Sequence, residues 1–149
     1  MSRAEGDIVF SRIQHTATAV VVYMRFRQLT VPKQYADFTL EFEGTNGRSV
    51  EAEIFVRHGL PQGEDYVFDQ TGRRCAHSNH INYAGDSAWM RIARGCLKDP
   101  KYIRVQARSR QIRISPTEES TEYYDTPTGD GGNNYDQLFN TWTPWVVTG

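Results

Sequence analysis

The feature of this chain that most constrains its fold is a strict alternation of apolar and polar residues in short runs. Residues 19–29, 38–43, 50–57, 87–92 and 102–112 all alternate in this way. A period of two places successive side chains on opposite faces of a β-strand, with one face buried and the other in water. Helical periodicity is almost absent. The pattern therefore predicts an all-β protein.

Turn residues separate these runs at the spacing typical of sandwiches and barrels. Asn46-Gly47 is the clearest hairpin signal, because both residues tolerate the positive φ angles of a tight turn. A chain of 149 residues has the size of one domain. We therefore expect a two-sheet antiparallel β-sandwich, jelly-roll-like, of about seven to nine strands with an irregular C-terminal segment. Residues 1–113 would form the sandwich body, and residues 114–149 an acidic loop and an apolar segment packed on it.

Charge is distributed unevenly along the chain. All 17 Lys and Arg residues precede residue 114, together with 12 of the 18 acidic residues, so this part carries a net charge of +5. Residues 114–149 carry six acidic residues and no base. We interpret residues 118–136 as an acidic surface segment that can lie against the basic body. No run approaches the roughly 18 apolar residues that a membrane span needs.

Cys75 and Cys96 lie at similar distances on either side of the expected turn at residues 84–86. Hairpin geometry can bring them close enough for a disulfide, and two unlinked buried thiols are the alternative. A zinc site is a third reading, with His77 and His80 as further ligands. The spacing argues against zinc, because on an extended strand His80 points away from the face that Cys75 and His77 share.

Residues 83–97, which read YAGDSAWMRIARGCL, resemble a segment of uncharacterised secreted actinobacterial proteins in which a strand runs into Cys-Leu. Residues 7–9, 24–29 and 139–146 are similar to other parts of that pattern, whereas Ala93 stands where those proteins carry proline. The resemblance implies an exported or cell-surface protein with a disulfide between Cys75 and Cys96 and a signal peptide outside this sequence. A cytoplasmic protein is the alternative.

More distantly, the strand and short turn at residues 92–97 resemble the sandwich of family-nine carbohydrate-binding modules and DOMON domains. Those domains bind sugars or haem. No Met and His pair matches a haem site, so the sequence predicts no cofactor. The resemblance supports a fold more than a function.

Catalytic motifs are absent from the sequence: it has no phosphate-binding glycine loop, no Gly-x-Ser-x-Gly and no His-Glu-x-x-His. Glu41 with Glu43, and Glu51 with Glu53, share a strand face, as the paired carboxylates of a glycosidase would. The plainer interpretation is the solvated face of a sheet. We therefore predict no catalytic residue.

A calcium site is a weaker possibility in the acidic segment, although the spacing is not that of an EF-hand. Its oxygen donors would be Asp125, Asp130, Asn133, Asn134 and Asp136.

Strand parity turns a set of basic and aromatic residues outward. If their strands share a sheet, these residues form one candidate binding face for a glycan, an anionic polymer or a protein. Alternatively, the acidic segment and residues 142–147 cover the face. The candidate residues are Tyr23, Arg25, Arg27, Trp89, Arg91, Tyr102, Arg104 and Arg108.

The sequence thus favours a non-catalytic extracellular binding or interaction module. A carbohydrate-binding module is one alternative and needs exposed coplanar rings such as Trp89 and Tyr102. A small enzyme with an unrecognised site is the other. Nucleic acid is disfavoured as a partner because the net charge of the chain is only −1. We also expect Trp142 and Trp145 to be largely buried and Trp89 to stay accessible.

Overall fold

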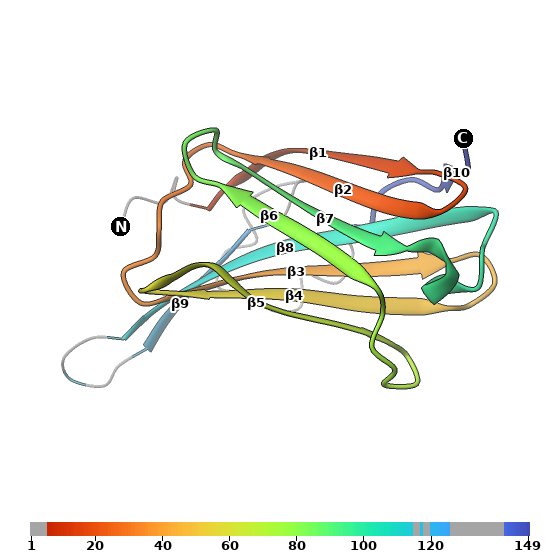
Figure 1. Cartoon of the computed structure of the whole chain (residues 1–149). Helices are drawn as coiled ribbons and strands as arrows, with labels where there is room; N and C mark the ends of the chain where they lie inside the picture. Colours follow the sequence, from red (N-terminus) through yellow and green to blue (C-terminus); the bar gives the residue numbers. More distant parts are fainter. Residues whose placement is uncertain (1–5, 115–116, 118–119, 126–141) are drawn as a thin grey trace.

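The structure, a computed structural model, describes residues 6–114, 117, 120–125 and 142–149. Over these residues it consists of two antiparallel β-sheets packed face to face, which confirms the expected two-sheet sandwich (Figure 1). One four-residue 3-10 helix, η1 (Arg94–Leu97), lies at the predicted turn after residue 93. Within the described residues, no helix has the length and apolar character that crossing a membrane requires.

The four-stranded sheet has the order β1-β2-β7-β6, and its strands are β1 (Ile8–His15), β2 (Ala19–Phe26), β7 (Ser87–Ala93) and β6 (His77–Asn82). The larger sheet has the order β10-β8-β3-β4-β5, and β9 also pairs with β8. Its strands are β10 (Val146–Val147), β8 (Tyr102–Ile114), β3 (Tyr35–Gly44), β4 (Ser49–Arg57), β5 (Leu60–Asp69) and β9 (Ser120–Asp125).

The core lies between the two sheets and is made of the inward-facing half of each alternating run. Met24 and Met90 come from the four-stranded sheet, and Leu40, Phe42 and Ile54 come from the larger one. All five side chains are fully buried. Burying a side chain of this size contributes roughly 1.5–3 kcal/mol, so the register of each strand is strongly fixed by its buried face.

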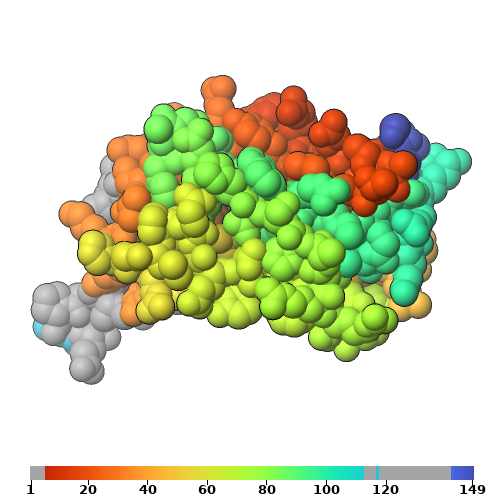
Figure 2. All heavy atoms as spheres, in the orientation of Figure 1, coloured from red at the N-terminus to blue at the C-terminus, as the bar shows by residue number. Residues whose placement is uncertain are grey.

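Figure 2 shows the atoms of β5 and β6 in contact along one edge of the sandwich, and polar side chains join the two strands there; we call this the polar seam. The Gln62 side chain accepts a hydrogen bond from the backbone N–H of Ile81 at 2.9 Å and donates one to its carbonyl at 2.8 Å. Asp65 accepts a bond from Asn79 at 2.6 Å and lies 2.8 Å from Nε2 of His77. Side chains therefore replace the backbone ladder that two edge strands of different sheets cannot form.

The C-terminal residues close the opposite edge. The backbone N–H of Thr143 donates to the carbonyl of Val105, and that of Gly149 donates to the carbonyl of His15, both at 2.9 Å. His15 is buried, with Nδ1 at 3.1 Å from the carbonyl of Val146 and Nε2 accepting from Arg94 at 3.1 Å. Residues 142–149 therefore tie the edge strand β1 to the larger sheet.

The expected burial of the C-terminal tryptophans is wrong for Trp145, whose side chain is 44% exposed. Trp142 and Trp89 are both half-buried. The guanidinium of Arg104 lies 4.6 Å from the ring centroid of Trp142 and 4.9 Å from that of Trp145. The two rings therefore pack on an outward-facing arginine of β8, because the space between the sheets is already filled by core side chains.

Candidate binding face on the four-stranded sheet

The outer face of the four-stranded sheet is built by alternation along its strands, which a bulge between Ile8 and Phe10 interrupts in β1. In β2, Val22 and Met24 point into the core, so Tyr23 points out. Tyr23 lies opposite Arg12 of β1 on one side and Trp89 of β7 on the other. His80 of β6 lies opposite Trp89 in turn. A single row of four outward side chains therefore crosses the whole sheet.

Two further rows flank this central row, and we call the twelve residues together the basic-aromatic face. Each flanking row is again a set of paired residues across the four strands; one row crosses β1 near its start and the other near its end. The first consists of Phe10, Arg25, Ser87 and Asn82, and the second of Gln14, Val21, Arg91 and Ser78.

The charge that the described residues place on this face is positive; the predicted acidic cover, residues 118–136, lies outside the described residues apart from the backbone of 120–125. The face carries Arg12, Arg25 and Arg91, all three exposed, and it includes no Asp or Glu. Among the described residues, none of these three arginines forms an ion pair, whereas Arg27, just beyond the end of β2, lies 3.4 Å from Asp7. Several positive charges on a single face raise the local concentration of anions.

The rings of the face are held by neighbours in the same row. The guanidinium of Arg12 lies 5.8 Å from the ring centroid of Tyr23, and the rings of His80 and Trp89 lie 6.4 Å apart at 42°. Tyr23 and Trp89 are half-buried, so each ring is supported by the sheet while part of it reaches solvent. Phe10 is 48% exposed on the edge strand. A ligand with flat apolar surface can therefore meet three aromatic side chains on this face.

The expected single binding surface is wrong in its extent, because the structure brings only half of its residues together. Tyr23, Arg25, Trp89 and Arg91 share the basic-aromatic face. Tyr102, Arg104 and Arg108 lie on β8, which pairs with β3 in the larger sheet. Outward residues of the two sheets of a sandwich point in opposite directions, so the two groups cannot contact one ligand.

Phe10, Arg12 and His80 belong to the face but were not among the predicted residues. Their own alternation in β1 and β6 places them outward, and that signal is present in the sequence. What the sequence lacks is the pairing of β2 with β7, which joins strands more than 60 residues apart.

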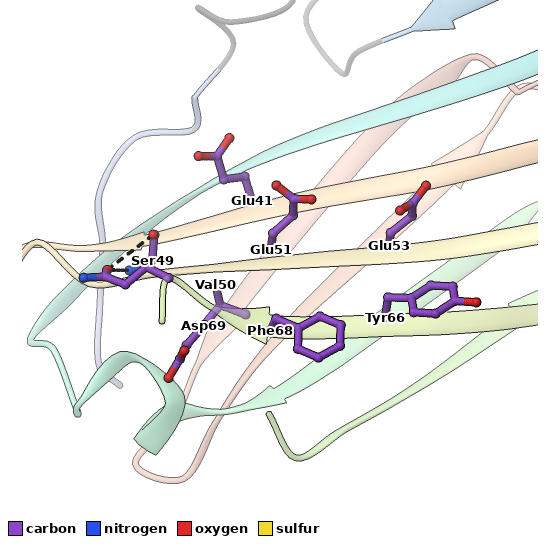
Figure 3. A pocket seen from close by; sticks show the side chains of 9 residues that line it. Glu41, Ser49, Val50, Glu51, Glu53, Tyr66, Phe68 and Asp69 are labelled. Carbon is purple, nitrogen blue, oxygen red and sulfur yellow. Dashed lines mark hydrogen bonds between the residues drawn. The ribbon is translucent and has the colours of Figure 1, made fainter. Parts of the chain in front are cut away.

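The larger sheet carries an acidic groove on its outer face, lined by Glu41, Glu51, Glu53, Tyr66 and Phe68 among others (Figure 3). Figure 3 shows the three carboxylates standing off β3 and β4, with the two rings beside them on β5. Burial raises the pKa of Glu41 and of Glu53 above 4.5, and the negative charge of Glu51 adds to this for both. Glu41 and Glu43, which the sequence pairs on one strand face, have different partners: Glu43 forms an ion pair with Arg104 at 2.6 Å, whereas Glu41 lines the groove.

Cys75 and Cys96 are brought together but are free thiols in this structure. Cys75 is buried, Cys96 is half-buried, and the two lie near each other without reaching disulfide distance. Burial raises the pKa of the Cys75 thiol to about 12, and the neighbouring Cys96 acts in the same direction. The Cys75 thiol is therefore neutral in the reduced protein.

The metal alternatives receive no support from the described part of the chain. Nδ1 of His77 lies 2.7 Å from the carbonyl of Cys75 and Nε2 faces Asp65, whereas His80 points to the outer face of the sheet. No group of three or more His, Cys, Asp or Glu residues converges as metal ligands within residues 6–114, 117, 120–125 and 142–149. For the calcium candidates, the side chain of Asp125 and all of Asp130, Asn133, Asn134 and Asp136 lie outside the described residues.

Comparisons with known proteins identify no family for this chain. The chain matches no protein-family model, and no curated protein is similar to it.

Proposed function

We propose that this protein is a non-catalytic binding module that holds an anionic ligand on its basic-aromatic face. The observation that carries the proposal is the grid of twelve residues, all but the buried Ser87 reaching solvent, with three arginines, three aromatic rings and no acidic side chain. Arginine and tryptophan are enriched at binding hot spots, because both combine a large contact area with a specific polar group.

The carbohydrate-binding alternative loses the pair of rings on which it depended. Trp89 lies on the four-stranded sheet and Tyr102, which is 37% exposed, lies on the larger one. Those two rings cannot stack on the same sugar chain. Tyr23 and Trp89 are cross-strand neighbours and remain available together, but they are flanked by arginine, which favours a ligand with negative charge.

Retention on a heparin column tests this proposal. Changing Arg25 and Arg91 to Ser should lower the salt concentration at which the protein elutes, because exposed arginines act through screened Coulomb attraction. A matched control changes Arg73 and Arg74 to Ser, which removes the same charge from the exposed turn between β5 and β6. Equal loss of retention in both variants, or no retention of the unmodified protein at low salt, would contradict the proposal.

We also propose that the protein is exported and that Cys75 and Cys96 then form a disulfide. The proximity of the two cysteines supports this pairing. Closing a loop of this length contributes about 3 kcal/mol in the chain-entropy model. Thiol titration of denatured, unreduced protein from an oxidising compartment should find no free thiol, and two free thiols there would reject the disulfide.

A further inference from the structure

We propose that the ligand of the basic-aromatic face is single-stranded nucleic acid, bound with its bases on Phe10, Tyr23 and Trp89 and its phosphates on Arg12, Arg25 and Arg91. This inference rests on the proposed function, because it names the chemical class of the anionic ligand. It depends on how rings and guanidinium groups alternate across the face.

Each aromatic ring of the face has an arginine as its neighbour. Phe10 lies opposite Arg25, and Tyr23 lies opposite Arg12. Trp89 and Arg91 are two residues apart on β7 and share a face. Directly opposed side chains on antiparallel strands have Cβ atoms about 4.5–5.5 Å apart, and diagonal neighbours about 7–8 Å. Rings and positive charges are thus interleaved across the face, as bases and phosphates alternate along a single strand of nucleic acid.

A single strand offers each nucleotide as one flat aromatic base joined to one negative charge. Proteins that bind such strands without sequence preference pair stacking rings with a positive surface. Four-stranded antiparallel sheets with outward rings are one of the arrangements that do this. The four strands of this sheet, spaced about 4.8 Å apart, give a face roughly 15 Å wide, which is enough for a short run of nucleotides.

Other polyanions use only part of this surface. A sulfated or uronic polysaccharide supplies negative charge but no aromatic face, so it leaves the three rings without a matching partner. A duplex keeps its bases stacked inside the helix and presents phosphates alone to a flat sheet. The combination of three rings with three arginines therefore favours an unpaired strand.

The near-neutral net charge of the chain, which disfavoured nucleic acid in the sequence, loses its force in the folded protein. Glu41, Glu51 and Glu53 lie on the outer face of the larger sheet. The basic-aromatic face lies on the other layer of the sandwich (Figure 1). The two faces point into solvent on opposite sides of the sandwich, so a ligand on the basic-aromatic face contacts none of these three carboxylates.

Fluorescence anisotropy with a labelled ten-nucleotide oligothymidylate and the full chain tests this inference. We expect binding at low salt, with log K falling against log[salt] at a slope of about −2, since each phosphate contact on a single strand contributes about −0.7. Phe10→Ser and Trp89→Leu should each weaken binding about 5- to 150-fold, the range that loss of one stacked base produces. Phe10→Ser leaves the core intact because Phe10 is an exposed residue of an edge strand.

Phe68→Ser is the matched control, since Phe68 is likewise an exposed phenylalanine, 40% accessible, but belongs to the larger sheet. It should leave the affinity for oligothymidylate unchanged. An abasic oligomer of the same length, a duplex of the same sequence and heparin are the competing ligands. Oligothymidylate should bind at least tenfold more tightly than the abasic oligomer or the duplex.

The possible failures are distinguishable. If the abasic oligomer, the duplex or heparin binds as tightly as oligothymidylate, the stacking inference is overturned while an anion-binding face remains. If Phe68→Ser weakens binding as much as Phe10→Ser, the basic-aromatic face is not the specific site for the oligothymidylate, and the inference is also overturned. If none of these polyanions binds at low salt, the inference and the proposed function both fail.

Discussion

Cys75 is a residue whose chemistry is set by its surroundings. Its thiol is buried, and burial raises its pKa to about 12, so almost no thiolate forms near neutral pH. Because the thiolate is the reactive species, the reduced and folded protein should react slowly with iodoacetamide at this position. Cys96 is half-buried on η1 and more accessible.

We predict that iodoacetamide at pH 8, added after reduction, labels Cys96 at least several-fold faster than Cys75. Mass spectrometry of the labelled peptides measures the two rates. The same reaction in urea is the control and should remove the difference, because unfolding exposes both thiols. Equal labelling rates in the folded protein would show that Cys75 is not protected.

Glu53 is a second residue whose ionisation is affected by the fold. Burial raises its pKa above 4.5, with the negative charge of Asp37 as the next cause. A carboxyl group that binds its proton more tightly in the folded state than in the unfolded state lowers stability as the pH rises through that interval. At neutral pH the folded protein therefore carries the whole penalty of ionising Glu53.

We predict that Glu53→Gln raises the midpoint of thermal unfolding at pH 7 and that the difference disappears well below pH 4.5, where Glu53 is protonated in both the folded and the unfolded state. The effect is small, about 0–1 kcal/mol, because Glu53 is partly exposed. Glu64→Gln is the control of opposite sign, since Glu64 lies 3.6 Å from Arg57 and accepts a hydrogen bond from Tyr66 at 3.0 Å. A lowered midpoint for Glu53→Gln at pH 7 would contradict this interpretation.

Elements meet at the polar seam between β5 and β6, where one side chain serves two backbone groups. Gln62 pairs with both the N–H and the carbonyl of Ile81, so it takes the place of a neighbouring strand. Its loss leaves two partly buried backbone groups without these partners. An unsatisfied buried donor or acceptor costs about 1–3 kcal/mol.

We predict that Gln62→Leu lowers the free energy of unfolding by about 1–3 kcal/mol, measured by urea denaturation. Gln14→Ala provides the comparison, because Gln14 is an exposed glutamine of β1. It should change stability by less than about 0.5 kcal/mol. If the two variants unfold at the same urea concentration, the seam contributes nothing to stability.

At the same scale, the sequence predicts strands well where each strand carries its own signal. Alternation placed Met24 and Met90 in the core and Tyr23 and Trp89 outside, and the structure confirms these faces. It did not predict β9, because residues 120–125 read STEYYD and do not alternate; their strand forms by pairing with the far half of β8.

The candidate face was predictable only in part, for the same physical reason. The parity of a strand decides whether a residue points out, but the sheet to which the strand belongs depends on pairing between distant segments. Arg91 and Arg104 have equivalent patterns in the sequence and end on opposite sides of the molecule, because β7 pairs with β2 and β8 pairs with β3.

At the scale of the whole molecule, the proposed function assigns binding to the four-stranded sheet, whereas the larger sheet uses its charges within the fold. Arg104 lies between Trp142 and Trp145 and binds Glu43 at 2.6 Å, so its charge is used within the larger sheet and the C-terminal residues. Arg91 is exposed on the other layer and forms no ion pair among the described residues. Replacing either arginine by Ala removes one positive charge from the protein.

We predict that the two replacements affect different properties, Arg104→Ala the stability and Arg91→Ala the binding to heparin. Arg104→Ala should lower the free energy of unfolding by about 1–3 kcal/mol, through loss of its charged hydrogen bonds and its contacts with both rings, and should shift tryptophan emission to longer wavelength. Its elution from heparin should change no more than that of Arg73→Ala, the matched charge control. Arg91→Ala should unfold like the unmodified protein and elute from heparin at lower salt. If Arg104→Ala weakens heparin retention as much as Arg91→Ala does, both sheets contribute to one binding surface and the separation of tasks is wrong.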